Sequence, residues 1–243
     1  MTYRSIIDGQ SGAPFIAEAL AANGPLIDPV SVPAPLIEMY RPLLPALILD
    51  VWEHFGIGDL GGGRMRLCVP RSLQGAVDQL FAGDPYLGGD TYALAYGAFG
   101  DLVAWNRRHQ MVYVNMQLSS VDVPALINPA LRGPDDQILL EGLLKLPPGA
   151  LDAFDDTGTQ MFDRAVEHYG ALPPLHIYGM HPPAPRNEAF SLENHRVAEV
   201  DEWLSVKIAE SVFKLDDPAG GRFGLRTIGP DPDGKTPARA GEL

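Results

Sequence analysis

A period of two in the side-chain pattern of residues 91–96 constrains the fold of this chain more than any other feature. Bulky side chains alternate there with small ones, which predicts a β-strand whose small face lets a helix approach closely. Gly100 and Asp101 separate this run from residues 102–105, and a glycine in first place is typical of a two-residue hairpin loop. A third run, residues 110–116, completes a predicted antiparallel meander of three strands.

Helices are predicted around this meander. Apolar residues return at helical spacing over residues 36–55, and Pro42 and Pro45 divide this stretch into two short helices. Residues 72–81 predict another helix, and the alternation in residues 64–69 predicts a strand that joins the meander. We therefore expect an α+β fold, an antiparallel sheet meander with helices packed on one of its faces.

The second part of the chain is predicted to be a smaller, helix-rich α+β unit. Helices are expected at residues 135–146, at residues 161–169 after the capping box Thr157–Gln160, and at residues 197–215. A short strand is expected at residues 175–178.

Prolines near residues 118–135 predict a domain boundary. The expected division is a leader at residues 1–24, a first domain at 25–125, a second domain at 135–215 and a loose tail at 216–243.

The charge of the chain excludes some classes of partner. The 243 residues include 31 acids against 18 lysines and arginines, and the net charge of −13 disfavours direct binding of nucleic acid while it suits a basic protein partner. No apolar run is long enough to span a membrane, and residues 1–8 lack the basic start and apolar core of a signal peptide. We therefore expect a cytoplasmic protein without membrane contact.

The residue types that usually carry catalysis do not form a recognisable site. His176, His181 and His195 are spaced unlike any common zinc framework, and Cys68 stands alone in an apolar run. No nucleophile elbow of the G-x-S-x-G type is present, and the triple glycine at residues 61–63 lacks a following lysine and helix. We therefore predict no enzyme activity, no catalytic residue, no cofactor and no metal.

Acidic residues concentrate between Asp135 and Glu167, where eight acids stand against Lys145 and Arg164. Carboxylates at helix starts ordinarily favour the positive end of the helix dipole, and a charged stretch is ordinarily a solvated face. The alternative is a docking surface for a basic partner, to which exposed aromatic residues would add anchors. The candidate partner-binding residues are Asp135, Asp136, Asp152, Asp155, Asp156 and Tyr86.

Short motifs occur in order along the first half. A Leu-Leu-Pro at residues 43–45 is followed by Trp52 and Gly56, and then by Phe99-Gly100-Asp101-Leu102 with Trp105 three residues on. In this order they resemble the GAD-like domain. The resemblance implies that Phe99, Gly100, Asp101 and Trp105 are structural motif residues.

The second half carries its own motifs, which are Phe-Asp-Arg-Ala at residues 162–165, Gly-Ala-Leu at 170–172, Ile-Tyr-Gly-Met at 177–180 and Leu-Glu-Asn at 192–194. They resemble the C-terminal domain of type VI secretion DNase-immunity proteins, and Tyr178 and Gly179 are the structural residues taken from them. This chain departs from the expected small, apolar pattern at residues 181–186, His-Pro-Pro-Ala-Pro-Arg.

Together the two resemblances imply a bacterial immunity protein that binds a cognate secreted nuclease toxin and holds it inactive. Two other classes stay open. A non-enzymatic regulatory or scaffold module with the same domains would bind another protein. An enzyme acting through the region of His176 and His181 would need a deep pocket with convergent polar groups.

Overall fold

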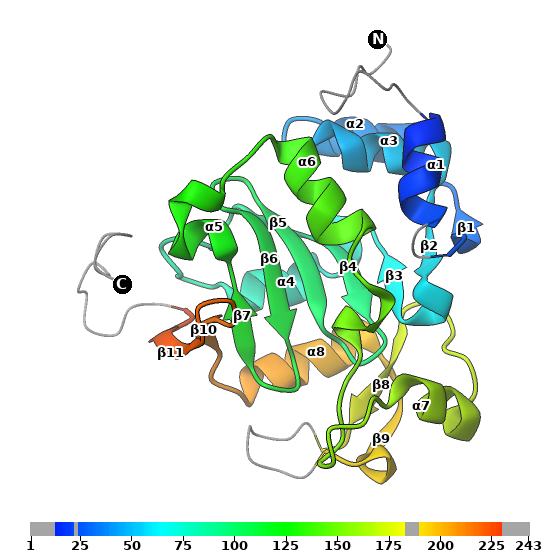
Figure 1. Ribbon diagram of the computed structural model, residues 1–243, viewed down its shortest axis with the longest axis vertical. Coiled ribbons are helices and arrows are strands. Elements are labelled where there is room, and N and C mark those ends of the chain that lie inside the picture. The colour runs from blue at the N-terminus through cyan, green and yellow to red at the C-terminus, as the bar shows by residue number, and fades with distance from the viewer. Residues whose placement is uncertain (1–12, 22–23, 183–189, 230–243) are drawn as a thin grey trace.

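Nine strands form one sheet that runs through the middle of the molecule (Figure 1). The computed structural model describes residues 13–21, 24–182 and 190–229. The strands lie in the order β1-β2-β3-β4-β5-β6-β7-β10-β11. Their bounds are Ile27–Val30 (β1), Ile57–Leu60 (β2), Met65–Leu67 (β3), Thr91–Gly97 (β4), Leu102–Asn106 (β5), Gln110–Asn115 (β6), Ser120–Asp122 (β7), Lys214–Asp217 (β10) and Arg222–Thr227 (β11). A separate hairpin pairs His176–Met180 (β8) with His195–Glu199 (β9).

The predicted meander is present. β4, β5 and β6 pair antiparallel in sequence, and β3 joins β4 as expected. The pairing of β7 with β10 is parallel, so the sheet is mostly antiparallel. The α+β fold class is therefore confirmed.

The helices of the described residues lie on both sides of this sheet. Their bounds are Ala13–Ala21 (α1), Ala34–Tyr40 (α2), Ala46–His54 (α3), Gln74–Leu80 (α4), Pro124–Ile127 (α5), Asp135–Leu139 (α6), Phe162–Tyr169 (α7) and Val200–Ala209 (α8), and a π-helical turn, Leu140–Leu144, continues α6. The two proline-divided helices, the helix at α4 and the helix at α6 confirm the sequence predictions.

Helices cover both faces of the sheet, which corrects the expectation of one covered face. α1, α3 and α6 pack on one face, while α4, α5 and α8 pack on the other (Figure 1). Side chains on both faces of β4 and β5 are buried, so each face needs a covering layer. A β-bulge in β4 also changes the predicted period of two. It places Leu94 and Ala95 on the α3 side, whereas Ala93 and Tyr96 face α4 and α8, so the strict alternation is interrupted.

The turn between β4 and β5 is longer than the predicted two-residue loop. Tyr96 pairs with Leu102, so the loop includes Ala98 and Phe99 as well as Gly100 and Asp101. Gly100 has a φ of 93°, which favours glycine, and its amide donates to Gly97 at 3.0 Å. The two-residue prediction is wrong because Ala98 and Phe99 leave the strand to pack against the second half of the chain.

The predicted long helix at residues 197–215 is also wrong. Residues 195–199 pair with β8, the helix α8 occupies only Val200–Ala209, and residues 214–217 form β10. Val200, Leu204 and Ile208 do form a buried helical face. Helical spacing beyond Ile208 was misleading because pairing with β7, a distant segment, decides the structure there.

Both ends of the described chain are more ordered than predicted. β10 ends and β11 lies within the first part of the expected tail, and α1, in the expected leader, buries Ile16 and Leu20 against α3. The domain boundaries stay a prediction, although β10 adds to the same sheet as the first seven strands. Within the described ranges, no helix has the length and apolar character needed to cross a membrane.

Candidate functional site

The β4–β5 turn joins the two halves of the molecule. The amide of Ala98 donates to the carbonyl of Arg64 at 2.9 Å, and the carbonyl of Ala98 accepts from the amide of Tyr178 at 2.8 Å. Phe99 is buried, and its ring centroid lies 5.7 Å from that of Tyr178 and 5.6 Å from that of His195. The motif residues therefore tie the main sheet to the β8–β9 hairpin.

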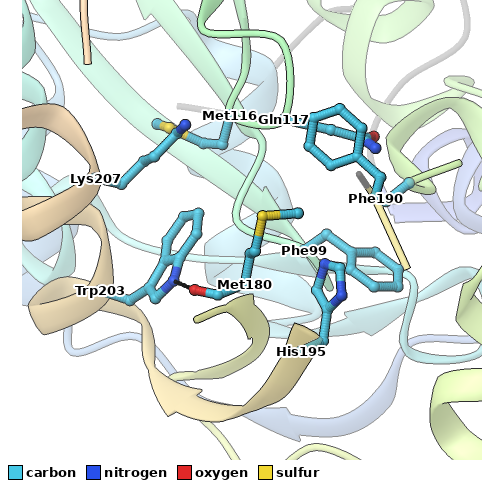
Figure 2. A pocket seen from close by; sticks show the side chains of 9 residues that line it. Phe99, Met116, Gln117, Met180, Phe190, His195, Trp203 and Lys207 are labelled. Carbon is cyan, nitrogen blue, oxygen red and sulfur yellow. Dashed lines mark hydrogen bonds between the residues drawn. The ribbon is translucent and has the colours of Figure 1, made fainter. Parts of the chain in front are cut away.

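Two glycines let Trp203 of α8 approach this turn. A Cβ at Gly100 would lie 2.8 Å from Cζ3 of Trp203, and a Cβ at Gly179 would lie 2.6 Å from its Cδ1. The indole Nε1 donates to the carbonyl of Met180 at 2.8 Å (Figure 2). The missing side chains of Gly100 and Gly179 thus leave room for the Trp203 indole, and the part of these glycines as motif residues stays a prediction.

A small cavity remains beside this joint, and Figure 2 shows the side chains around it. Phe99, Met180, His195 and Trp203 surround it, and Lys207 reaches it from α8. Its volume of about 20 Å³ is enough for one water molecule but not for an organic ligand. Burial lowers the pKa of His195 and that of Lys207, although Glu210 opposes the change at Lys207. This cavity is a packing feature.

A much larger cavity of about 420 Å³ opens where the edge of the sheet faces α7. β1, β2 and β3 form one side, and α7 with residues 171–178 forms the other; these elements lie together at the right of Figure 1. We call it the junction groove. It is lined largely by apolar side chains, and the lining residues used below are Ile27, Asp28, Val30, Asp59, Arg66, Cys68, Tyr96, Val166, Leu172 and Tyr178.

An ion pair holds the wall of the junction groove. Arg66 of β3 binds both carboxylate oxygens of Asp59 in β2, and its Nη1 donates to the carbonyl of Pro173 at 2.9 Å. Burial lowers the pKa of Arg66, but the hydrogen bonds and charges of Asp59 and Tyr96 together outweigh burial and raise the pKa. The hydroxyl of Tyr96 accepts from the amide of Leu175 at 3.0 Å. These contacts connect the main sheet to the segment before β8.

Burial changes the pKa values of the thiol and the phenols that line the junction groove. Burial raises the pKa of the Cys68 thiol to about 12, so this sulfur stays protonated at neutral pH. Burial also raises the pKa values of Tyr96 and Tyr178. The thiol and the two phenols that line the groove are therefore neutral at neutral pH, while its charged groups are Asp28 and the Arg66–Asp59 ion pair.

The predicted acidic residues fall into two separate groups. Asp135 and Asp136 begin α6, at the opposite end of the molecule from α7 (Figure 1). Asp135 accepts from Nε2 of Gln110 at 2.7 Å, and Asp136 accepts from the amide of Leu47 at 2.8 Å, so it caps α3. The acidic stretch therefore does not form one face.

Asp152 is buried and caps α7. Its Oδ1 accepts from the amides of Met161 and Phe162, at 3.3 Å and 3.0 Å, and burial raises its pKa while these amides oppose the change. Its expected exposure to a partner is wrong. The capping box predicted at residues 157–160 is also wrong. The helix begins only at Phe162, and the carboxylate of Asp152, from outside the helix, accepts from its first amides.

Asp155 and Asp156 organise the loop before α7. Asp155 accepts from the amides of Thr157 and Thr159 and pairs with Arg164 at 2.5 Å. The hydrogen bonds from the Thr157 side chain and Arg164 lower its pKa. Asp156 is exposed and accepts from the amide of Phe190 at 2.7 Å. Their part in partner binding stays a prediction.

Tyr86 is half-buried beside an ion pair that anchors β11. Arg226 binds Asp84 at 2.5 Å, and its guanidinium carbon lies 5.2 Å from the ring centroid of Tyr86. The Tyr86 ring also meets His109 edge-on, with centroids 6.0 Å apart. Tyr86 thus packs against Arg226 and His109, and its part in partner binding stays a prediction.

The remaining motif residues are internal. Asp101 is buried, and its Oδ1 accepts from the amide of Met116 at 2.7 Å. Trp105 is buried in the core on the α3 side of the sheet. Sequence reasoning missed Arg66 and Asp59 because it predicted the strand of Arg66 but not the strand of Asp59 that pairs with it.

The histidines do not converge. The imidazoles of His176 and His195 each bond a nearby carbonyl, Pro174 and Ser191 respectively, both at 2.8 Å. Among residues 13–21, 24–182 and 190–229, no group of three or more His, Cys, Asp or Glu side chains is arranged to hold a metal ion. Residues 181–186, where the sequence departs from the expected apolar pattern, are described only as far as Pro182. Residues 183–186 lie outside the described residues.

Comparisons with known proteins agree with this architecture. The crystal structure of Atu4351 from Agrobacterium tumefaciens is similar to this chain, with a TM-score of 0.78 and 26% sequence identity over 86% of this chain and 96% of that one. Among curated proteins, no match was found. The family model of the GAD-like domain matches residues 15–118, from α1 to the turn after β6. The chain therefore contains a GAD-like domain.

Proposed function

We propose that this protein is a bacterial immunity protein that works in the cytoplasm, where it binds and inhibits a nuclease toxin of a type VI secretion system. The observation that carries the proposal is the junction groove, an apolar groove of about 420 Å³ on a chain of net charge −13. Apolar anchors in a groove and complementary charge around it are what a tight protein–protein interface requires.

The charge of the chain supports a nuclease as the partner. A nuclease presents a basic surface to DNA, and an acidic protein is drawn to such a surface by long-range attraction. Covering the DNA-binding face is enough to inhibit cleavage, so the immunity protein itself needs no catalytic residue. The second-half motifs, which resemble those of DNase-immunity proteins, support the same proposal.

The proposal is tested by isolating the partner and measuring its activity. The tagged protein is purified from its native host, co-purifying proteins are identified by mass spectrometry, and the DNA cleavage activity of each is measured with increasing amounts of this protein. A nuclease whose activity falls to zero near a stoichiometric amount supports the proposal. A partner without toxic activity would instead favour the regulatory or scaffold module, and no nuclease among the partners would overturn the proposal.

A further inference from the structure

The junction groove has the shape of a site for inserted side chains. Tyr178 lies fully buried in it, while Val166 of α7 and Leu172 are half-buried on its wall. At the mouth, Ile27 and Val30 of β1 expose 41% and 61% of their surface. Exposed apolar residues beside a deep apolar groove are typical of a surface that a partner covers.

Strand addition is not the mode that this edge favours. β1 is the edge strand of the sheet, but it contains Pro29, which has no amide hydrogen, and Asp28 has a φ of 47°. A proline and a left-handed residue within four positions prevent a regular ladder with a new strand. A partner at this edge must therefore be held mainly by its side chains.

The charges of the junction groove select the flanking residues of the partner. Arg66 is occupied by Asp59 and by the carbonyl of Pro173. Asp28 is exposed at the mouth and makes no ion pair or side-chain hydrogen bond within the described residues. One uncompensated carboxylate beside an apolar groove is complementary to an apolar side chain flanked by a lysine or arginine.

We propose that the junction groove is the docking site for the nuclease. A surface segment of the nuclease inserts a large apolar side chain between β1 and α7, against Val166 and Leu172, and places a lysine or arginine on Asp28. This inference rests on the proposed function, and it names the surface that the proposed function leaves open.

The test compares variants at the groove mouth with a matched variant elsewhere. Val30→Arg places a cation and added bulk at the mouth, and Asp28→Asn removes the charge while keeping a residue type that tolerates positive φ. The control is Val212→Arg, because Val212 is 66% exposed, similar to Val30, and does not line the groove. Since these side chains are exposed, the fold tolerates all three changes, which circular dichroism checks.

The measured quantity is the dissociation constant for the nuclease that co-purifies with the wild-type protein, rendered inactive and titrated by calorimetry. We expect Val30→Arg to weaken binding about tenfold or more, Asp28→Asn about threefold at low salt, and Val212→Arg to leave it unchanged. If the wild-type protein binds the nuclease and both groove variants bind equally well, the docking site is refuted while the proposed function stands. If the wild-type protein binds no nuclease, both are refuted.

A cross-linking experiment gives an independent readout. A photo-reactive amino acid at position 30 should attach to the inactive nuclease, whereas one at position 212 should not. Mass spectrometry of the adduct should find a segment with a large apolar residue next to a lysine or arginine. Attachment at position 212 only, or to a segment without these residues, would overturn the inference.

Discussion

Asp101 makes the stability of this protein fall as the pH rises through neutrality. Its carboxylate is buried in the joint between the two halves, where it accepts from the amide of Met116 at 2.7 Å and from the side chain of Asn115 at 3.3 Å. Burial raises its pKa to about 7, although the Met116 amide opposes the change. The same group has a pKa of about 3.9 in an unfolded chain.

The free energy of unfolding decreases with rising pH because the folded state keeps the Asp101 proton to a higher pH than the unfolded chain does. Below about pH 4 both states are protonated, and Asp101 contributes no pH dependence. Between about pH 4 and pH 7 the unfolded chain releases the proton first, so the free energy of unfolding decreases as the pH rises. With a folded pKa of about 7, the loss between pH 5 and pH 8 is about 2–3 kcal/mol.

The substitution Asp101→Asn isolates this effect. Asparagine retains an acceptor for the Met116 amide and does not ionise. The free energy of unfolding of the variant should therefore not decrease with pH in this way, and at pH 8 it should exceed that of the wild-type protein. Urea denaturation of both proteins at pH 5 and pH 8 measures the difference. Burial also raises the pKa of Asp122 to about 6, but this residue is present in both proteins and cancels. Parallel stability curves for the two proteins would refute the reasoning.

Three further substitutions test the structural contacts. Asp152→Ala leaves the Phe162 amide at the start of α7 without an acceptor, while the Met161 amide keeps the carbonyl of Ala153, and should cost about 1–2 kcal/mol in urea denaturation; a neutral result would show that water replaces the cap. Arg226→Met leaves the buried Asp84 unpaired and should cost about 3–5 kcal/mol at pH 7, with a smaller loss at acidic pH where Asp84 is protonated; an equal loss at both pH values would contradict the ion pair. Gly179→Ala places a methyl group against the Trp203 indole and should cost about 1–3 kcal/mol and change the near-ultraviolet circular dichroism; an unchanged spectrum would argue against the close packing.

The central sheet could be predicted from the sequence because its strands are neighbours in the chain. Residues 91–116 pair with one another through short turns, so local alternation contains the needed information. The residues from 195 to 217 could not be assigned in this way. They follow helical spacing closely, but β8 and β7 pair with parts of them and convert these parts into strands.

The candidate site depended even more on contacts between distant segments. The sequence shows many carboxylates between Asp135 and Glu167, but not that Asp136 caps a helix 89 residues before it or that Asp152 is buried. The junction groove forms only where β1 faces α7, so no local pattern indicates it. Net charge supports only the prediction of a basic partner, and it cannot locate a surface that would bind one.

The parallel pairing of β7 with β10 has a consequence for how this protein folds. Ser120 has no partner on its outer side until Lys214 has been synthesised, so the nascent chain carries an open strand edge for much of its synthesis. A fragment that ends at residue 118 would lack β7, β10 and β11 and would leave β6 as an exposed edge. We therefore expect residues 15–118, the segment that the family model matches, to aggregate or recruit chaperones when expressed alone, whereas a chain that includes β11 should not.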